Sequence, residues 1–292
     1  FRRVLFRSAR YLPAVRLGRW NGKISYFSMG GSTYVSLLEP IITYLYDKHY
    51  DIELVDLRQT RDDIKFDKVH ENSFADIVWP DKHTNAGQPI MLRDYQVEIV
   101  NNFLENPQAL QEVATGAGKT LMTAALSKSV EQLGRSLVIV PNKSLVVQTE
   151  ADYINLGLDV GVYFGDRKEY GKTHTICTWQ SLNNLFKNKA DVGEDPDMDD
   201  FFFDDVVCVI VDEVHMAKAD VLKQLLTQVF ANVPIRWGLT GTIPKEPYEF
   251  MALKCSLGDV VGQLTASELQ AAGHLAQCHV NIVQLIDHVE YN

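Results

Sequence analysis

Short apolar runs alternate with amphipathic stretches from Met91 onward. This pattern is typical of an α/β fold in which helices cover both faces of a parallel sheet. Strands are predicted at residues 136–140, 174–178, 206–211 and 236–240, with a weaker candidate at 110–114. The clearest helix follows Lys119, because apolar side chains recur there at helical spacing and Gly134 is a suitable stop.

Residues 9–85 show a different pattern and are predicted to form a small α+β module. Turn residues between short apolar stretches favour a hairpin, and apolar residues three and four apart favour a helix. The expected elements are a hairpin that turns at Trp20-Asn21-Gly22 between Val15 and the Ile24 to Tyr26 stretch, a helix over residues 37–46, a strand over residues 52–55 and a polar linker over residues 80–89.

The two ends of the chain carry separate predictions. Residues 1–8 resemble translated sequencing adapter, so we expect a non-native leader there and a reading frame that begins upstream. Near the other end, Thr265 or Ser267 is expected to cap a helix that ends at Gly273, before a strand at 280–285. The expected segments are the leader at 1–8, the module at 9–85, the main α/β lobe at 86–262, and a linker with the start of a further lobe at 263–292.

The composition, 46% hydrophobic and 23% charged over 292 residues, fits an ordinary globular protein. The longest unbroken hydrophobic run is the six residues Val206–Val211, whereas a membrane-spanning helix needs about 20. No membrane span is expected. The four cysteines lie far apart without a C-x-x-C pair, which indicates neither a zinc knuckle nor a disulfide framework and favours a reducing cytosol.

The formal net charge of −10 at first argues against a polyanionic partner. However, residues 190–205 contribute −8 of it and contain no base, so the rest of the chain carries only −2. A run of like charges is typical of a solvated, mobile loop. A mimic of nucleic acid that inhibits the site is the alternative interpretation.

A candidate phosphate-binding loop opens the predicted helix. It reads Ala114-Thr115-Gly116-Ala117-Gly118-Lys119-Thr120, with Val113 where the strict G-x-x-x-x-G-K-[ST] pattern has its first glycine. Glycines let backbone amides turn toward an oxyanion, and the helix N-terminus adds partial positive charge. Lys119 is expected to reach the β- and γ-phosphates of ATP, and Thr120 to bind Mg²⁺.

A second motif, Asp212-Glu213-Val214-His215, follows the predicted strand 206–211. The carboxyl end of a central parallel strand is where open α/β sheets bind ligands. Asp212 is expected to hold Mg²⁺, and Glu213 to orient and deprotonate the attacking water. An acidic turn after an apolar strand is also a common structural feature, so this interpretation depends on the pair of motifs.

Together these motifs resemble those of the superfamily 2 helicases and translocases, specifically the DExH branch. The resemblance covers about residues 90–285 and implies a RecA-like P-loop NTPase fold that uses ATP and Mg²⁺. It also implies contacts to adenine and to the nucleic-acid backbone. The residues implied are Arg93 and Gln96 within Leu92-Arg93-Asp94-Tyr95-Gln96 for adenine, and Pro141, Asn142, Ser144, Gln148, Thr178, Trp179 and Gln180 for nucleic acid.

Leu239-Thr240-Gly241-Thr242 resembles the family motif that links the nucleotide state to nucleic-acid contacts. The resemblance implies that Thr240 and Thr242 are coupling residues and that a hydroxyl there bonds His215. It thereby adds His215 to the three catalytic candidates Lys119, Asp212 and Glu213. A structural role in the core is the alternative for this histidine.

The N-terminal module is similar to that of the phage UvsW-type DNA helicases, because Arg16-Leu17-Gly18-Arg19-Trp20-Asn21-Gly22-Lys23 is basic, aromatic and glycine-bearing. This likeness implies contacts from Arg16, Arg19 and Lys23 to DNA phosphates and stacking of a base on Trp20. Anchoring of a hairpin core is the alternative for Trp20.

The expected function is that of the first motor lobe of an ATP-dependent DNA helicase that acts on branched replication or recombination DNA, in the cytosol of a bacterium or a phage-infected host. No Q-x-x-G-R-x-x-R motif follows residue 262. We therefore expect a second RecA-like lobe in the full-length chain, and very slow ATP hydrolysis by this polypeptide. The alternatives are the motor of a restriction-enzyme translocating subunit and a non-catalytic ATP-gated DNA-binding module; RNA as the substrate also stays open.

Overall fold

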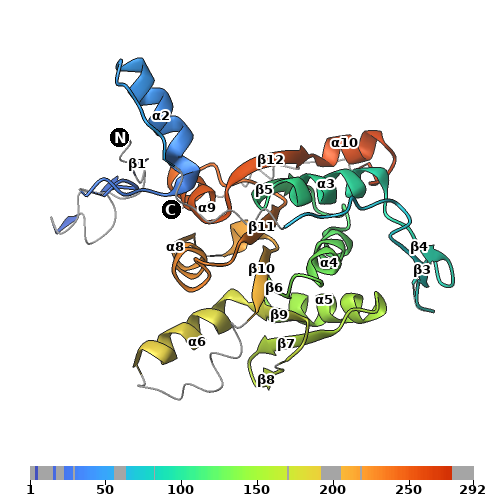
Figure 1. Cartoon of the computed structure of the whole chain (residues 1–292). Helices are drawn as coiled ribbons and strands as arrows, with labels where there is room; N and C mark the ends of the chain where they lie inside the picture. Colours follow the sequence, from blue (N-terminus) through green and yellow to red (C-terminus); the bar gives the residue numbers. More distant parts are fainter. Residues whose placement is uncertain are drawn as a thin grey trace, which may run out of the picture.

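An eight-stranded sheet with helices on both faces forms the centre of the molecule (Figure 1). The computed structural model describes residues 4–5, 16–17, 23–28, 30–55, 64–81, 83–169, 171–191, 205–217 and 219–277. Within these ranges, no helix combines the length and apolar character that a membrane crossing requires.

The strands of the central sheet lie in the order β12-β5-β11-β10-β6-β9-β7-β8. Their bounds are β5 (Gln108–Val113), β6 (Arg135–Val140), β7 (Val160–Phe164), β8 (Arg167–Lys168), β9 (His174–Thr178), β10 (Val206–Val211), β11 (Ile235–Thr240) and β12 (Asp259–Leu264). Neighbouring strands are parallel except β7 and β8. The carboxyl ends of the parallel strands therefore share one edge, where such sheets bind ligands.

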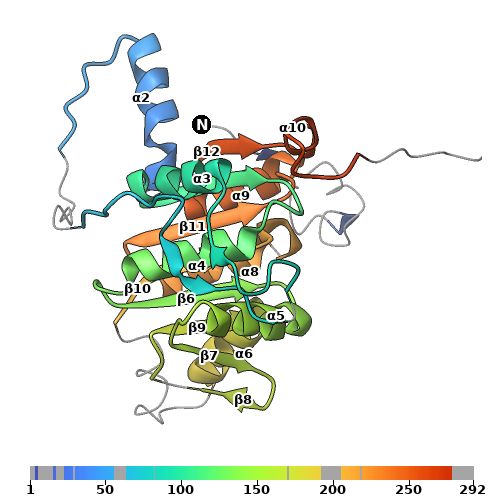
Figure 2. The ribbon, with the colours of Figure 1, turned by 90° about the vertical axis from the view of Figure 1, so that its right-hand side faces the viewer.

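Two helical layers cover the sheet, as Figure 2 shows for the face turned toward the viewer. This face carries α3 (Asp94–Glu105), α4 (Lys119–Val130), α5 (Lys143–Asn155) and α10 (Ala266–Ala271). The opposite face carries α6 (Trp179–Asp191), α8 (Ala219–Gln224), the π-helical turn Leu225–Val229 and α9 (Pro247–Leu257).

Alternation along the strands divides the apolar core into two layers. In β10, Cys208 and Ile210 face the layer under α3, α4 and α5, whereas Val209 and Val211 face the layer under α6, α8 and α9. Successive side chains of a strand point to opposite faces, so a strand covered on both sides must be apolar throughout. This explains why the continuous apolar runs in the sequence mark the central strands.

The predicted strands are confirmed as β6, β9, β10 and β11, and the weaker candidate is β5. Helix α4 begins at Lys119 as predicted, but it ends at Val130, so the predicted stop at Gly134 is wrong. Gly134 instead lies in the turn into β6. It has a φ of +148°, and a Cβ there would stand 2.7 Å from the carbonyl oxygen of Asp205.

The C-terminal helix is present as α10. The hydroxyl of Thr265, not Ser267, caps it by accepting a hydrogen bond from the backbone N–H of Glu268, whose side chain completes a capping box. The predicted strand at 280–285 lies outside the described residues, as does nearly all of the acidic run 190–205.

The N-terminal elements differ from the prediction. Strand β2 (Lys23–Ile24) pairs with β1 (Val4–Leu5), inside the octet that was expected to be a non-native leader, rather than with residues around Val15. The expected turn at residues 20–22 lies outside the described residues. The predicted helix is confirmed as α2 (Leu38–Asp47), after a 3₁₀ turn at Val35–Leu37. The predicted strand over residues 52–55 is wrong, because these residues pair with no strand in the part of the chain that the structure describes.

The stretch 80–89 is not a linker. It connects β3 (Phe74–Val78) to β4 (Pro89–Ile90), and these two strands pair antiparallel. Phe74 and Ile90 are fully buried in the same core layer as α3 and α4. The expected boundary at residues 85/86 therefore falls within a hairpin that packs on the main sheet domain.

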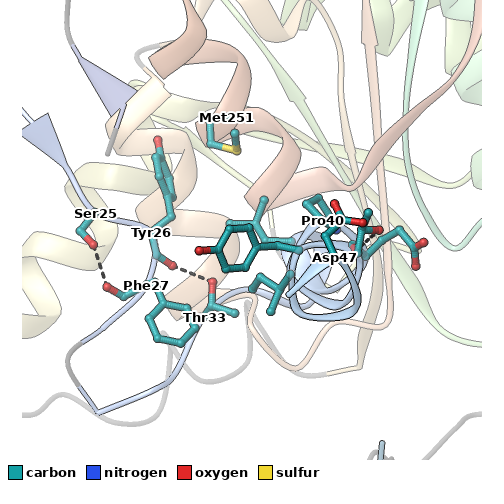
Figure 3. Close-up of a pocket in the computed structure, with 12 residues that line it drawn as sticks. Ser25, Tyr26, Phe27, Thr33, Pro40, Asp47 and Met251 are labelled. Carbon is teal, nitrogen blue, oxygen red and sulfur yellow. Dashed lines mark hydrogen bonds between the residues drawn. The ribbon is translucent and has the colours of Figure 1, made fainter. Parts of the chain in front are cut away.

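The N-terminal residues contact the rest of the molecule through Tyr26. Among the side chains described between residues 25 and 55, only that of Tyr26 is buried, and its hydroxyl donates to the carbonyl of Tyr248 in α9. Beside it lies a pocket of about 850 Å³ between α2 and Met251 of α9 (Figure 3). Its lining is mainly apolar and includes the carboxylates Glu39 and Asp47, so it is unsuited to phosphate.

Candidate nucleotide and nucleic-acid site

The loop between β5 and α4 has a backbone that only glycine adopts readily at two positions. Gly116 and Gly118 have φ values of +88° and +81°. A Cβ on Gly118 would also stand 2.6 Å from Nε2 of Gln96. The residues at these two positions are therefore fixed by backbone geometry, which leaves the loop amides free of side-chain obstruction.

Lys119 contacts the acidic motif directly. Its Nζ lies 2.7 Å from Oε1 of Glu213 and also donates to the carbonyl of Val113 at 3.3 Å. The lysine is 9% exposed. A buried charge needs a partner, so the loop and the end of β10 are held together electrostatically.

Asp212 lies beside this pair at the carboxyl end of β10. Burial, and to a lesser extent the negative charge of Glu213, raises the pKa of its carboxyl to about 6, and the nearby Lys119 opposes the shift. One Asp212 oxygen accepts the backbone N–H of Glu213 at 2.9 Å. A buried carboxylate with an unfavourable environment is a group that a bound cation would stabilise.

Glu213 also connects to the end of β11. Its Oε2 accepts the backbone N–H of Gly241 at 3.3 Å and lies 3.4 Å from Nδ1 of His215. Nδ1 of His215 lies 2.8 Å from the hydroxyl of Thr240, which donates to the carbonyl of Thr242. The contact between the histidine and this motif, predicted from the resemblance, is therefore present.

The predicted adenine residues adjoin the same loop. The side chain of Gln96, 4% exposed, donates to the carbonyl of Ala117 at 3.0 Å and accepts the backbone N–H of Arg93 at 2.9 Å. Tyr95 donates to the same carbonyl at 3.1 Å. A pocket of about 350 Å³ opens beside these residues.

That pocket contains residues that the sequence interpretation missed. Trp79 and His83 line it and stack on each other, with ring centroids 3.9 Å apart. The pocket is lined by Trp79, His83, Asn85, Gln88, Pro89, Met91, Arg93, Gln96, Gly116, Ala117, Gly118 and Leu121. His83 lies in the stretch that was expected to be a linker and Trp79 directly precedes it, so the polar character of that stretch gave no sign of either residue.

The predicted nucleic-acid residues gather at the same edge of the sheet. Val140 and Thr178 are opposite each other at the ends of β6 and β9, and the amide of Gln180 donates to the carbonyl of Pro141 at 3.4 Å. Asn142 caps α5 by accepting the backbone N–H of Leu145. The exposed members of this group are Asn142, Ser144, Gln148 and Gln180, whereas Pro141 and Thr178 are buried and Trp179 is half-buried.

Lys143, which the sequence interpretation did not single out, lies beside these residues. Its side chain is exposed, and its Nζ would lie 3.6 Å from a Cβ on Gly165, in the turn between β7 and β8. The N-terminal candidates are less defined. Arg16 is exposed, only the backbone of Lys23 is described, and Arg19 and Trp20 lie outside the described residues.

The polar and charged groups at this site fit a nucleoside triphosphate with a divalent cation. The glycine-lined loop and Lys119 suit phosphate oxygens, and Thr120, half-buried at the start of α4, supplies a hydroxyl next to the lysine. Asp212 is a hard oxygen ligand in a site that disfavours its own charge. Thr115 of the loop lies next to Gly241, which follows β11. A Cβ on Gly241 would stand 3.1 Å from Oγ1 of Thr115.

Comparison with known proteins gives one family and several relatives. The family model described as "Type III restriction enzyme, res subunit" matches residues 89–245. The chain is 21% identical over 290 residues to the ATP-dependent DNA helicase uvsW of Enterobacteria phage T4, covering 94% of this chain and 53% of that protein. It is 27% identical over 204 residues to the DNA 3'-5' translocase XPB2 of Sulfurisphaera tokodaii, covering 69% and 41%. The chain thus spans about half the length of these relatives.

Solved structures support the fold. The structure described as the UvsW helicase from bacteriophage T4 matches with a TM-score of 0.67 at 18% identity, covering 89% of both chains. A second structure of T4 UvsW matches with a TM-score of 0.65, covering 89% of this chain and 51% of that one. The RecA-like arrangement of a parallel sheet between two helical layers is therefore shared.

Proposed function

The chain belongs to the family described as the res subunit of type III restriction enzymes, and from that premise we propose that it carries the ATP-binding motor lobe of an ATP-dependent DNA helicase or translocase. The observation that carries the proposal is the ion pair between Lys119 and Glu213. It brings the phosphate-type loop and the acidic strand end, 94 positions apart in the numbering, to one point at the ligand-binding edge of the sheet.

Each residue at this point has a proposed role. Lys119 and the amides of the loop would bind the phosphates, while Arg93 and Gln96 would bind adenine beside Trp79. Thr120 and Asp212 would hold Mg²⁺, which when bound neutralises charge on the phosphate oxygens.

Glu213 would orient the attacking water and accept its proton once Lys119 turns to the phosphates. His215 is hydrogen-bonded to Thr240 and lies beside Glu213, so it would transmit a change at Glu213 to the end of β11. The link is direct, because the same carboxylate contacts Lys119, His215 and the Gly241 amide.

The second proposed surface binds the nucleic-acid backbone. Exposed Asn142, Ser144, Gln148 and Gln180 provide hydrogen-bonding groups at the ends of β6 and β9, on the edge that also carries the nucleotide site. Such contacts position a strand without reading its sequence. The arrangement does not distinguish DNA from RNA, and DNA is proposed because the uvsW and XPB2 relatives are described as acting on it.

The wider assignment is also a proposal. We propose that residues 9–85 assist nucleic-acid binding through Arg16, Arg19, Trp20 and Lys23, although strand β3 of that segment pairs with β4 and packs on the proposed motor lobe of residues 86–262. We further propose that residues 263–292 lead into a second RecA-like lobe that supplies transition-state arginines. Relatives about twice as long as the matched stretch support that second lobe. Branched replication or recombination DNA, in the cytosol of a bacterium or an infected host, is the proposed substrate and setting.

One rival function has a specific observation in its favour. The matching family is described as a restriction-enzyme subunit, which favours the motor of a translocating restriction enzyme. A nuclease domain in the full-length protein would support that rival, and cleavage of DNA by the full-length protein would decide for it.

Binding of a fluorescent ATP analogue to the polypeptide of residues 1–292 tests the site. We expect the parent to bind with Mg²⁺, Lys119→Ala to lose binding by at least about tenfold because a charged hydrogen bond to phosphate is removed, and Glu213→Gln to keep binding but lose residual hydrolysis. Lys128→Ala, at the other end of α4, is the matched control. Equal binding by Lys119→Ala and the parent, with both folded by circular dichroism, would make the assignment wrong.

A further inference from the structure

A tight turn follows α10 and is tied back to that helix. The backbone N–H groups of His274 and Leu275 both donate to the carbonyl of Leu269, at 2.8 and 3.1 Å. The side chain of Gln270 donates to the carbonyl of Ala276 at 3.1 Å. Leu269 is 1% exposed, so residues 273–276, called here the post-α10 turn, are anchored to the core.

The post-α10 turn packs on the phosphate-binding loop. A Cβ on Gly116 would lie 2.8 Å from Cδ2 of Leu275, which places the leucine methyl against the backbone of that glycine. The ring of His274 lies 5.1 Å from the ring of Tyr95, whose hydroxyl donates to Ala117 in the same loop.

The phosphate-binding loop is therefore held by contacts from α3, from the end of β12 and from the post-α10 turn. Gln96 and Tyr95 hold the carbonyl of Ala117 from α3. The backbone N–H of Ala114 donates to the carbonyl of Leu264 at the end of β12 at 2.9 Å. Leu275 supplies an apolar contact at the glycine between these two points.

We infer that Leu275 is a positioning residue for nucleotide binding: its side chain fixes the backbone of Gly116, and through the post-α10 turn it couples nucleotide occupancy to the chain that continues beyond residue 277. This inference rests on the proposed function, because it concerns the same loop. Nucleotide is bound by loop amides that must hold one arrangement, so a contact that restricts the loop beforehand lowers the cost of binding.

The coupling is reciprocal by thermodynamic necessity. If Leu275 favours the nucleotide-binding shape of the loop, then bound nucleotide must favour the packed state of the post-α10 turn by the same factor. The hydrogen bonds from His274 and Leu275 to Leu269 report that state, because both amides exchange with solvent only when the turn opens.

The first test compares Leu275→Ala with Leu275→Met and Ile77→Ala in the polypeptide of residues 1–292. Ile77 is a half-buried aliphatic residue of β3 that packs on the same core layer, and its Cδ1 lies 3.8 Å from the Cβ position of Gly157, after α5. We expect the Kd for the fluorescent ATP analogue to rise about three- to tenfold in Leu275→Ala. It should return toward the parent value in Leu275→Met, which keeps the volume, and stay unchanged in Ile77→Ala.

The second test is a double-mutant cycle with Gly116→Ala. The added Cβ is strained by the φ of +88° and also collides with Leu275. Only the collision is relieved by shortening the leucine, so Gly116→Ala should weaken binding by a smaller factor in the Leu275→Ala background than in the parent. Hydrogen exchange at residues 274 and 275 should slow with the analogue in the parent and not in Leu275→Ala.

The outcomes separate this inference from the proposed function. If the parent fails to bind the analogue, or Lys119→Ala binds as well as the parent, the proposed function fails. If the parent binds and Lys119→Ala does not, but Leu275→Ala has the parent's Kd, or its effect adds independently to that of Gly116→Ala, the inference about Leu275 is overturned.

Discussion

Glu213 has a φ of +49°, in the left-handed region that residues other than glycine rarely adopt. Its surroundings hold it there: the side chain pairs with Lys119, and its carbonyl accepts the backbone N–H of Met216 at 2.8 Å. A strained residue persists only where its neighbours over-determine it. The strain lies at the residue that we propose to accept the proton of the attacking water, so the backbone preference of glutamate and its proposed chemical role conflict at this position.

Val113 shows why an incomplete motif still builds the loop. It stands where the strict pattern has a glycine, but it is still part of β5 and pairs with Leu264 of β12. The left-handed conformations begin only at Gly116 and recur at Gly118. A glycine is therefore not required at position 113 in this chain.

His174 is a buried histidine outside the nucleotide site, and it predicts a pH dependence of stability. Its Nδ1 lies 2.7 Å from the hydroxyl of Ser136 and its Nε2 lies 2.9 Å from Glu131. Burial lowers the pKa of His174, although Glu131 opposes the shift. The unfolded chain therefore takes up a proton at a higher pH than the folded chain, so stability is full above about pH 6.5 and falls as the pH decreases through that value.

Urea unfolding of the parent and of His174→Gln between pH 7.5 and 5.5 measures this effect. The parent should lose more unfolding free energy on acidification than the variant does, whereas His70→Gln, at an exposed histidine, should match the parent. The comparison is between variants because Asp212 acts oppositely: with a pKa raised from its ordinary value to about 6, its carboxyl lowers stability as the pH rises through that interval, and acidification below about pH 6 restores it. Equal pH dependence in the parent and His174→Gln would contradict the prediction.

At the scale of elements, one residue joins α9 to β12. Gly258 has a φ of +110°, and a Cβ there would lie 2.3 Å from the carbonyl oxygen of Gln108 in the neighbouring strand. Gln108 is part of β5 and Gly258 directly precedes β12, which pairs with β5, so the two backbones cannot easily move apart. Gly258→Ala should lower the unfolding free energy by at least about 3 kcal/mol, since strain and a backbone clash add.

Gly87→Ala is the matched control for Gly258→Ala. Gly87 also has a positive φ, +75°, but nothing lies within 4 Å of its Cβ position. Only the conformational cost of about 1 to 2 kcal/mol is expected there. Urea or thermal unfolding separates the two effects, and equal losses in the two variants would show that the close approach to Gln108 is unimportant.

The sequence predicted well those elements in which all side chains lie in the same kind of environment, such as the buried interior. Strands β6 and β10 are apolar throughout because both faces are covered. Strand β5 was weak by pattern because Gln111 interrupts it, yet that side chain is 1% exposed and donates to the carbonyl of Ile99. A buried polar residue with a partner elsewhere in the chain is invisible to a local pattern.

Elements whose pairing or packing involves residues far away in the sequence were predicted badly, because a local pattern does not contain those residues. Residues 52–55 include strand-forming residues, but no strand edge among the described residues pairs with them. Similarly, β3 and β4 were read as the end of a module and a linker, although Phe74 and Ile90 are buried in the main core. The nucleotide loop and the acidic strand end were found because their chemistry is encoded in contiguous residues, whereas the Trp79–His83 pair arises only from folding of that hairpin.

At the scale of the whole molecule, the net charge of −10 must be reconciled with a polyanionic partner. The proposed nucleic-acid edge relies mainly on neutral groups, Asn142, Ser144, Gln148 and Gln180. Lys143 is the exposed cation among them, at the first position of α5. Few basic contacts mean few released counterions, so we expect weak binding of single-stranded DNA with a shallow dependence on salt.

Substitution of Lys143 tests the expected salt dependence at a single residue. If its ammonium group neutralises one phosphate, Lys143→Ala should reduce the slope of log K against log salt by about 0.7 for single-stranded DNA, and should weaken binding equally for different sequences. Lys48→Ala removes another exposed lysine, directly after α2, which is not among the residues proposed to contact nucleic acid, and should leave the slope unchanged. Fluorescence anisotropy of labelled oligothymidine across a salt series gives both slopes. The two variants have the same net charge, so a loss of slope confined to Lys143→Ala reports a phosphate at that edge, whereas equal slopes in both would place the strand elsewhere on the molecule.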